Sequence, residues 1–167
     1  MTQAETAAAV DPQDFRNAMA RFASGVTVVT ARDAHGVLSG FTASAFSSLS
    51  LDPPLVLVCL ETKSHSYDTF AACEQMAISV LAAGQGDEAW HFAKKDIDRF
   101  GGRELVQGAV TGLPLVPGAL VHLECAVHER LPGGDHVILV GRVLRAANTE
   151  AGPLIHFNRT MGHFEAD

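Results

Sequence analysis

The chain has 167 residues, of which 47% are hydrophobic and 19% are charged, and its formal net charge is -7. A chain of this size folds around a single core, so we expect one domain over residues 11–167, preceded by a flexible segment at residues 1–10. The excess of acidic residues excludes DNA and RNA as partners, because nucleic-acid phosphates attract basic surfaces. No signal peptide or long apolar segment is recognisable, so we expect a cytoplasmic protein with no membrane partner.

The three cysteines, Cys59, Cys73 and Cys125, predict neither a disulfide framework nor a metal site. Their number is odd, each lies among apolar residues, and the sequence has no Cys-x-x-Cys pair. We therefore expect reduced, buried thiols and no bound metal.

The N-terminal part of the domain predicts a helix followed by a hairpin. Asp11 and the proline after it are typical of a helix start, and apolar residues then recur at helical spacing until Gly25. The β-branched run 26–30 and the extended segment 37–46 flank a turn at 33–36, which favours two antiparallel strands.

Apolar runs predict the next elements. Residues 55–60 form an unbroken apolar run after two prolines, which is typical of a strand buried on both faces. Residues 76–81 predict another strand and residues 84–93 a short helix. Residues 96–118 are rich in Gly and Pro and predict mainly loop.

The C-terminal third predicts further strands. Polar and apolar residues alternate over residues 120–129, so His122, Glu124 and His128 are expected on a solvent-facing side of the sheet rather than around a metal. Many strands joined by tight turns, with few and short helices, predict a closed antiparallel sheet. The sequence lacks the βαβ alternation and glycine motif of a Rossmann domain, and it has no P-loop.

Two polar segments are candidates for ligand binding. Residues 39–50 combine a glycine and small side chains with several hydroxyls, so a phosphate or polar ligand can approach the backbone there. In residues 63–66, Ser64 or Ser66 can cap a short helix that ends at Cys73. Free amides at that helix start, together with Lys63 and His65, favour an anion.

The sequence offers little for nucleophilic catalysis. The cysteines have no electropositive neighbours in sequence, and no serine lies in a G-x-S-x-G turn. We infer that a bound organic cofactor supplies the chemistry.

Four motifs in the same order resemble the short-chain flavin reductases, the reductase components of two-component flavin-dependent monooxygenases. They are the block from Phe15 to Thr30, the segment Gly40 to Ser50 followed by Asp52-Pro53-Pro54, the Gly134-Asp135-His136 turn with its strand, and Pro153-Leu154-Ile155. The resemblance covers about residues 12–165 of the chain.

This resemblance implies a mainly β fold with short helices, a split β-barrel of Greek-key antiparallel topology, assembled as a homodimer. It implies reduction of FMN or FAD by NADH or NADPH through direct hydride transfer, and delivery of reduced flavin to a partner monooxygenase. The sequence does not choose between the two flavins or between the two pyridine nucleotides.

Site residues also follow from the resemblance. His136 is expected to position the nicotinamide, although a turn histidine that bonds only to Asp135 is an equal alternative. Phe157, Asn158, Arg159 and Thr160 are expected to contribute to nicotinamide binding. Flavin contacts are expected from Thr42, Ala43, Ser44, Ala45, Ser47, Ser48, Cys59, Leu60, Glu61, Lys63, Ser64, His65, Ser66, His91 and Phe92.

The chain departs from the family pattern at two positions. His65 stands where the family usually has an arginine or lysine, and the tyrosine common near Met161 is missing, so His163 or Phe164 could take its place. Two other functions remain open at this stage. One is a flavin carrier of the same fold without turnover, and the other is an enzyme like pyridoxamine-phosphate oxidase.

Overall fold

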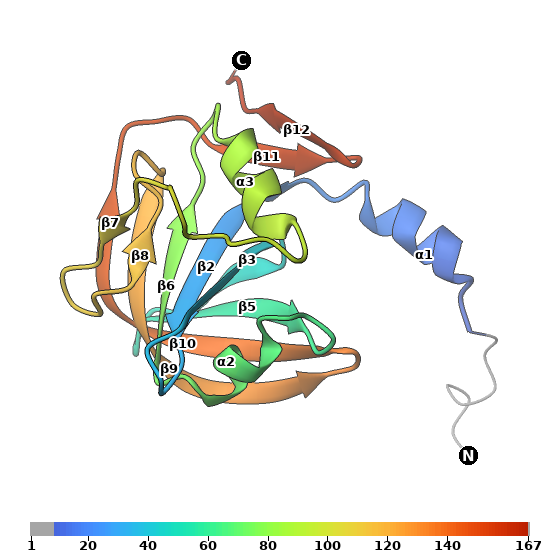
Figure 1. The fold of residues 1–167 in the computed structure, drawn as a ribbon. Coiled ribbons are helices and arrows are strands. Elements are labelled where there is room, and N and C mark those ends of the chain that lie inside the picture. The colour runs from blue at the N-terminus through green and yellow to red at the C-terminus, as the bar shows by residue number, and fades with distance from the viewer. Residues whose placement is uncertain (1–8, 167) are drawn as a thin grey trace.

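The computed structural model describes residues 9–166 and is built mainly of β-strands with three short helices in that range (Figure 1). The expected flexible segment at residues 1–10 falls almost wholly outside the described residues. The elements are α1 (Pro12–Met19), β1 (Ser24–Gly25), β2 (Thr27–Arg32), β3 (Leu38–Ala43), β4 (Phe46–Ser50), β5 (Leu55–Glu61), α2 (Tyr67–Ala72), β6 (Gln75–Val80), α3 (Gly86–Ala93), β7 (Val106–Gln107), β8 (Pro114–Leu115), β9 (Val121–Gly133), β10 (His136–Asn148), β11 (Leu154–Phe157) and β12 (Thr160–His163).

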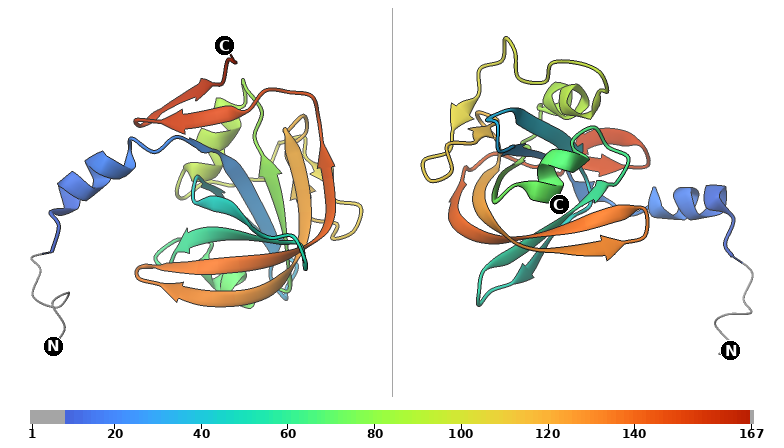
Figure 2. Two further views of the ribbon diagram at one scale, coloured as in Figure 1. Left: turned by 180° about the vertical axis from the view of Figure 1, so that it is seen from behind. Right: turned by 60° about the horizontal axis from the view of Figure 1, so that its bottom comes forward.

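Seven antiparallel strands form one curved sheet in the order β3-β2-β6-β9-β10-β5-β4 (Figures 1 and 2). β3 and β4 are its two edges, and they follow one another in the chain through a bend at Ser44 and Ala45. They do not pair with each other, so the expectation of a closed sheet is wrong. The bend turns the chain from one edge of the sheet to the other, and thereby places small polar residues in the gap between the edges.

The main core lies inside the curve of the sheet and includes Val29, Phe41, Val58, Phe70 and Leu139. A second apolar cluster lies on the other side of β2, beneath α3. β2 is therefore buried on both faces. β5, for which we expected two buried faces, instead alternates between buried and half-buried residues, so only one of its faces is fully buried.

The helix α2 has six residues and begins after Ser66, whose side chain makes no capping hydrogen bond. The Ser66 hydroxyl instead donates to the carbonyl oxygen of Gly40 at 3.1 Å and is fully buried. The Ser66 side chain therefore does not cap the helix, and its hydroxyl joins α2 to β3 and is not free for a ligand. The Ser64 hydroxyl, the other expected cap, accepts from the Ser66 amide at 3.2 Å. Anion binding at this helix start stays a prediction.

Two residues of β9 that were expected to face solvent are engaged by neighbouring segments, Glu124 by the loop between β7 and β8 and His122 by the residue after β8. Glu124 is only 2% exposed and accepts hydrogen bonds from the amides of Val110 and Thr111 at 2.9 and 2.6 Å. His122 is half-buried and bonds through Nε2 to the carbonyl oxygen of Val116 at 2.6 Å. The alternating pattern identified the strand, and His128 is exposed as expected, but the Glu124 side chain is buried and holds the β7–β8 loop.

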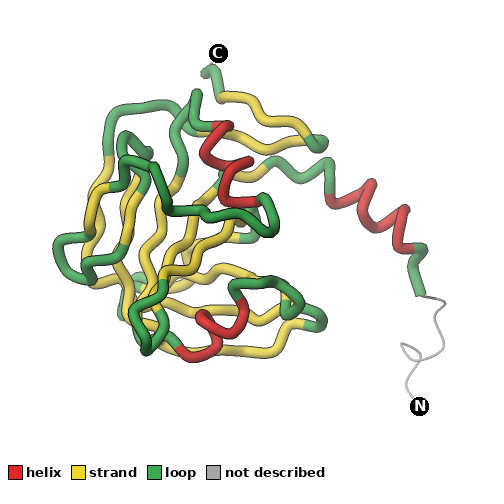
Figure 3. Tube along the Cα trace, in the orientation of Figure 1, coloured by secondary structure: helices red, strands yellow, loops and turns green. Residues whose placement is uncertain are grey.

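The helix α1 lies apart from the sheet in every view, and none of its residues is buried (Figures 1, 2 and 3). Asp11 caps it, as expected, by accepting hydrogen bonds from the amides of Gln13 and Asp14. The helix ends at Met19, earlier than the predicted stop at Gly25, which lies in β1. The turn between β11 and β12 contacts the end of this helix, because the Asn158 amide donates to the carbonyl oxygen of Ala20 at 2.8 Å.

Among residues 9–166, no helix has the length and apolar character needed to span a bilayer. The three cysteines carry free thiols, as expected. Cys73 and Cys125 are buried and Cys59 is half-buried.

Candidate functional site

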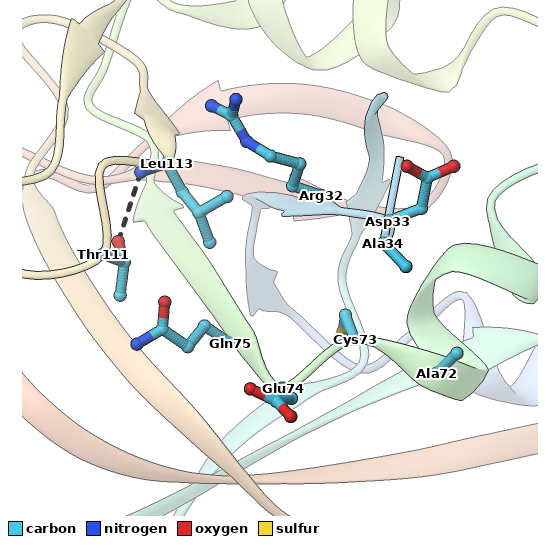
Figure 4. A pocket seen from close by; sticks show the side chains of 9 residues that line it. All are labelled: Arg32, Asp33, Ala34, Ala72, Cys73, Glu74, Gln75, Thr111 and Leu113. Atoms are coloured by element: carbon cyan, nitrogen blue, oxygen red, sulfur yellow. Dashed lines mark hydrogen bonds between the residues drawn. The ribbon is translucent and has the colours of Figure 1, made fainter. Parts of the chain in front are cut away.

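Two cavities compete as the functional site. The larger one, of about 420 Å³, lies between the β2–β3 turn and the segment after α2 (Figure 4). Its lining includes Arg32, Asp33, Glu74 and Gln75, and at its edge the Leu113 amide donates to the Thr111 hydroxyl at 3.3 Å. None of the residues expected to bind a ligand or act in catalysis lies there.

The second cavity, of about 290 Å³, gathers most of the predicted ligand-binding residues. Its lining comes from the end of β3 and the β3–β4 bend, the end of β5 and the segment before α2, the end of α3 and the segment after it, and the start of β10. The predicted residues that line it are Thr42, Ala43, Ser44, Ala45, Cys59, Leu60, Glu61, Ser64, His65, Phe92 and His136. This agreement makes the smaller cavity the candidate site.

The β3–β4 bend presents unpaired donors to this cavity. The Ala45 carbonyl oxygen accepts from the Cys59 amide at 3.0 Å, which fixes the bend against β5. Within the described part of the chain, the amides of Ser44 and Ala45 have no acceptor, and the Ser44 hydroxyl has no partner. Such free donors beside small side chains suit an electronegative, planar ligand that approaches the backbone closely.

The Thr42 hydroxyl is already engaged. It donates to the carbonyl oxygen of Ala89 at 2.6 Å and thereby joins β3 to α3. Thr42 therefore shapes the wall of the cavity, and its methyl group and backbone rather than its hydroxyl are available to a ligand.

His136 lies at the mouth of the cavity opposite Glu61, with which it pairs across β10 and β5. Its Nδ1 atom is 2.7 Å from Oδ1 of Asp135. The hydrogen bond and charge of His136 hold the pKa of Asp135 below its usual value. An ionised carboxylate only accepts hydrogen bonds, so Nδ1 carries the proton and Nε2 remains for a ligand. His136 therefore bonds to Asp135 and also lines the cavity, and its contact with the nicotinamide stays a prediction.

Some predicted residues do not line this cavity. Ser47 and Ser48 lie on the exposed edge strand β4. Lys63 and Ser66 also lie outside the lining. His91 bonds through Nε2 to the carbonyl oxygen of Arg99 at 3.1 Å. Phe157, Asn158, Arg159 and Thr160 form or flank the β11–β12 turn. There Arg159 donates to the Asn17 side chain at 2.8 Å and the Arg21 guanidinium lies 5.3 Å from the Phe157 ring centroid.

Four lining residues were missed by the sequence analysis, namely Phe41, Ala93, Lys95 and Arg99. Arg99 belongs to the stretch 96–118 that was predicted to be mainly loop, Lys95 lies between that stretch and the predicted helix, and neither was assigned a ligand role. The cluster of basic residues directly after a predicted helix was the signal that could have revealed them.

Charge is divided around the cavity. His65, Lys95 and Arg99 contribute basic groups on the side of α2 and the segment after α3, and Glu61 contributes a carboxylate at the end of β5. His65 Nε2 lies 3.7 Å from a carboxylate oxygen of Asp96, which joins the two basic segments. Burial raises the pKa of the Cys59 thiol, so this group is uncharged and does not act as a nucleophile. The basic side of the site suits a phosphate, and the β3–β4 side suits a ring.

These features define a site for a planar ligand that carries a phosphate, on a curved antiparallel sheet. The family described as "Flavin reductase like domain" matches residues 19–165, and the chain belongs to this family.

Two curated proteins illustrate the similarity in sequence. The chain is 45% identical over 152 residues to "Actinorhodin polyketide dimerase" of Streptomyces coelicolor, a match that covers 90% of this chain and 85% of that protein. It is 42% identical over 144 residues to "Probable flavin reductase" of Rhizobium meliloti, covering 86% of this chain but only 46% of that longer protein.

Solved structures extend the similarity to the whole fold. The NADH:FAD oxidoreductase of Streptomyces globisporus, in complex with NAD and FAD fragments, has a TM-score of 0.88 and 38% identity, over 96% of this chain and 99% of its own. The flavin reductase component of a bacterial two-component tryptophan halogenase has a TM-score of 0.86 and 34% identity, over 94% of this chain and 100% of its own.

Proposed function

We propose that this chain reduces FMN or FAD with NADH or NADPH by direct hydride transfer. The observation that carries the proposal is the cavity in which the free amides of Ser44 and Ala45 and the imidazole of His136 meet, in a member of the flavin reductase family. The similar Streptomyces globisporus enzyme, which binds NAD and FAD fragments, supports the same substrates here.

The chemistry belongs to the two substrates, because the hydride passes from C4 of the nicotinamide to N5 of the flavin. The protein has to hold the two rings in contact. The free amides at Ser44 and Ala45 donate hydrogen bonds to the flavin and stabilise the negative charge that the ring gains on reduction. No protein nucleophile or general base is required.

His136 positions the nicotinamide in this proposal. Asp135 fixes the ring through Nδ1, and the Asp135 carbonyl oxygen is itself held by the Thr62 amide at 2.9 Å. The imidazole therefore has a fixed orientation, with Nε2 free to bond to the nicotinamide carboxamide or to its ribose phosphate.

We also propose a homodimer. Phe15, Met19 and Phe22 are 53%, 54% and 76% exposed and recur at helical spacing, so α1 and the residues after it present an apolar face to solvent. A second copy that covers this face would bury it. The β11–β12 turn adjoins α1, so a dimer formed through α1 would bring residues 157–160 near the partner's surface, where we place their contribution to nicotinamide binding. Light scattering of the purified protein tests the dimer, and a fully active monomer would contradict it.

The reduced flavin, in this proposal, leaves for a flavin-dependent monooxygenase. The chain's similarity to a reductase component of a two-component system supports this role. The free thiols fit a reducing compartment, and we place the protein in the cytoplasm.

A steady-state matrix of two flavins against two pyridine nucleotides tests the function. We expect the pyridine nucleotide to be consumed only when flavin is present, and the matrix reports both specificities. A flavin carrier would bind flavin in a titration but leave NADH and NADPH unconsumed. An enzyme like pyridoxamine-phosphate oxidase would instead bind pyridoxal phosphate, which the absorption spectrum detects.

A further inference from the structure

The loop between α3 and β7 holds an unpaired lysine beside the cavity. Lys95 and Arg99 both line the site, but the two side chains differ in what they contact. Arg99 donates through Nε to the carbonyl oxygen of Phe92 at 3.1 Å and through Nη2 to that of Lys94. Its guanidinium is thus engaged in closing the C-terminal end of α3.

Lys95 has no such engagement. It is exposed, and within residues 9–166 its ammonium group makes no hydrogen bond or ion pair with the protein. A free ammonium at the edge of a concave site is a point charge available to a bound anion.

The loop that carries Lys95 is held at both ends. Before it, the Lys94 amide bonds to the last carbonyls of α3, and Arg99 bonds back to the same helix. After it, one carboxylate oxygen of Asp98 accepts from the amides of Phe100 and Gly101 at 3.0 and 2.9 Å. Lys95 is therefore placed near the cavity by a short, braced segment.

Phe100 fastens the far end of this segment to the core. Its ring centroid lies 5.6 Å from that of Phe92, edge to face. A Cβ atom at Gly40 would lie 3.1 Å from the Phe100 ring, so the glycine of β3 allows this close approach.

We propose that Lys95 binds the phosphate group of the flavin and makes the protein prefer FMN and FAD to riboflavin. The inference rests on the proposed function, because it assumes that the ring lies at the β3–β4 bend. The phosphate end of the flavin then lies on the basic side of the cavity where, among the described residues, the Lys95 ammonium has no protein partner.

Equilibrium binding tests the proposal with a readout that does not depend on turnover. Dissociation constants for FMN, FAD and riboflavin are measured by flavin fluorescence for the wild type, Lys95→Ala, Lys95→Arg and Lys94→Ala. Lys94 is the matched control, because it is an exposed lysine next in sequence whose side chain does not line the cavity.

We expect Lys95→Ala to weaken binding of FMN and FAD by about fivefold to twentyfold, which is the usual effect of losing one charge-assisted hydrogen bond at an exposed site. Riboflavin binding should be unchanged. Lys95→Arg should restore most of the affinity for FMN, and Lys94→Ala should bind all three flavins like the wild type.

Three results would overturn the assignment. Equal loss for riboflavin and FMN in Lys95→Ala would mean a contact with the ring, and an equal loss in Lys94→Ala would mean general electrostatic attraction. A higher KM for NADH with riboflavin as acceptor would place the nucleotide's pyrophosphate at Lys95. Failure of the proposed function is a separate result. The titration measures the preference for phosphorylated flavins even in a protein that does not oxidise NADH or NADPH.

Discussion

The imidazole of His136 is held by the carboxylate of the residue before it, with 2.7 Å between Nδ1 of His136 and Oδ1 of Asp135. The segment after β5 holds the backbone of this pair in place, since the Thr62 amide and hydroxyl both donate to the Asp135 carbonyl oxygen. A histidine that starts a strand would otherwise rotate freely. Here one tautomer and one ring orientation are selected at the mouth of the cavity.

Replacement of His136 by alanine should raise the KM for the pyridine nucleotide by about threefold to tenfold, the effect of one lost hydrogen bond. Flavin affinity should not change, because the flavin is assigned to the opposite side of the cavity. Asp135→Asn should give a smaller increase in the same KM, since it loosens the ring without removing it. His128→Ala, an exposed histidine on β9, is the matched control. Wild-type kinetics in His136→Ala would show that the imidazole does not contact the nucleotide.

An acidic residue at position 44 should weaken flavin binding by at least tenfold, through charge repulsion and loss of space beside the free amides. Flavin titration of Ser44→Asp measures this. Ser48→Asp separates two hypotheses, because Ser48 lies on β4 outside the cavity lining whereas the sequence placed both serines in one flavin-binding segment. We expect the larger effect at Ser44. Equal effects would mean that the whole segment contacts flavin.

The sequence predicted those parts of the site that lie on regular elements. The hydroxyl-rich segment and the end of the apolar run 55–60 meet in the cavity because both are strand ends of the same sheet. The hairpin of β2 and β3 followed from β-branched residues on either side of a turn. These predictions rest on local sequence patterns, and the strands of the sheet agree with them.

The predictions that failed depended on tertiary contacts. Ser66 was a candidate helix cap, but its hydroxyl donates to the carbonyl oxygen of Gly40 in β3. Glu124 alternated with apolar neighbours and so looked solvent-facing, yet a distant loop covers it. Lys95 was missed because no ligand role was assigned to the basic residues after the predicted helix. The partners of Ser66 and Glu124 lie 26 and 13 residues away in sequence, beyond the reach of local patterns.

Thiol labelling should distinguish Cys59 from the other two cysteines. Burial raises the pKa of all three thiols, that of Cys125 to about 12, so the folded protein should react slowly and only at Cys59, which is half-buried in the cavity lining. The rate should rise with pH, because the thiolate is the reactive form. Saturating FMN should slow the labelling. Mass spectrometry locates the label, and a rate at Cys59 that does not respond to FMN would place the flavin elsewhere.

Removal of the Glu124 charge should destabilise the fold without changing the site. Burial alone would raise the pKa of this carboxyl, but hydrogen bonds from Thr111 and Val110 outweigh it and hold the pKa below its ordinary value. A depressed pKa in the folded state means that the ionised carboxyl stabilises the fold fully above its ordinary pKa of about 4.3. This contribution to the free energy of unfolding is lost as the pH falls through the lower pKa of the folded state. The wild type should therefore lose stability below about pH 4. Glu124→Gln should lose this part of the pH dependence.

At pH 7 the Glu124→Gln variant should be about 2 to 3 kcal/mol less stable, because the three loop donors bond to one carboxylate oxygen and a neutral amide oxygen accepts these bonds less strongly. For a domain of this size that corresponds to a Tm lower by roughly 5 to 10 °C. Glu129→Gln, an exposed residue of the same strand, is the matched control and should melt like the wild type. Thermal unfolding followed by circular dichroism at pH 4 and pH 7 measures both effects. If Glu124→Gln melted like the wild type at pH 7, the carboxylate would not hold the β7–β8 loop, and the pH dependence would have to come from other acidic groups.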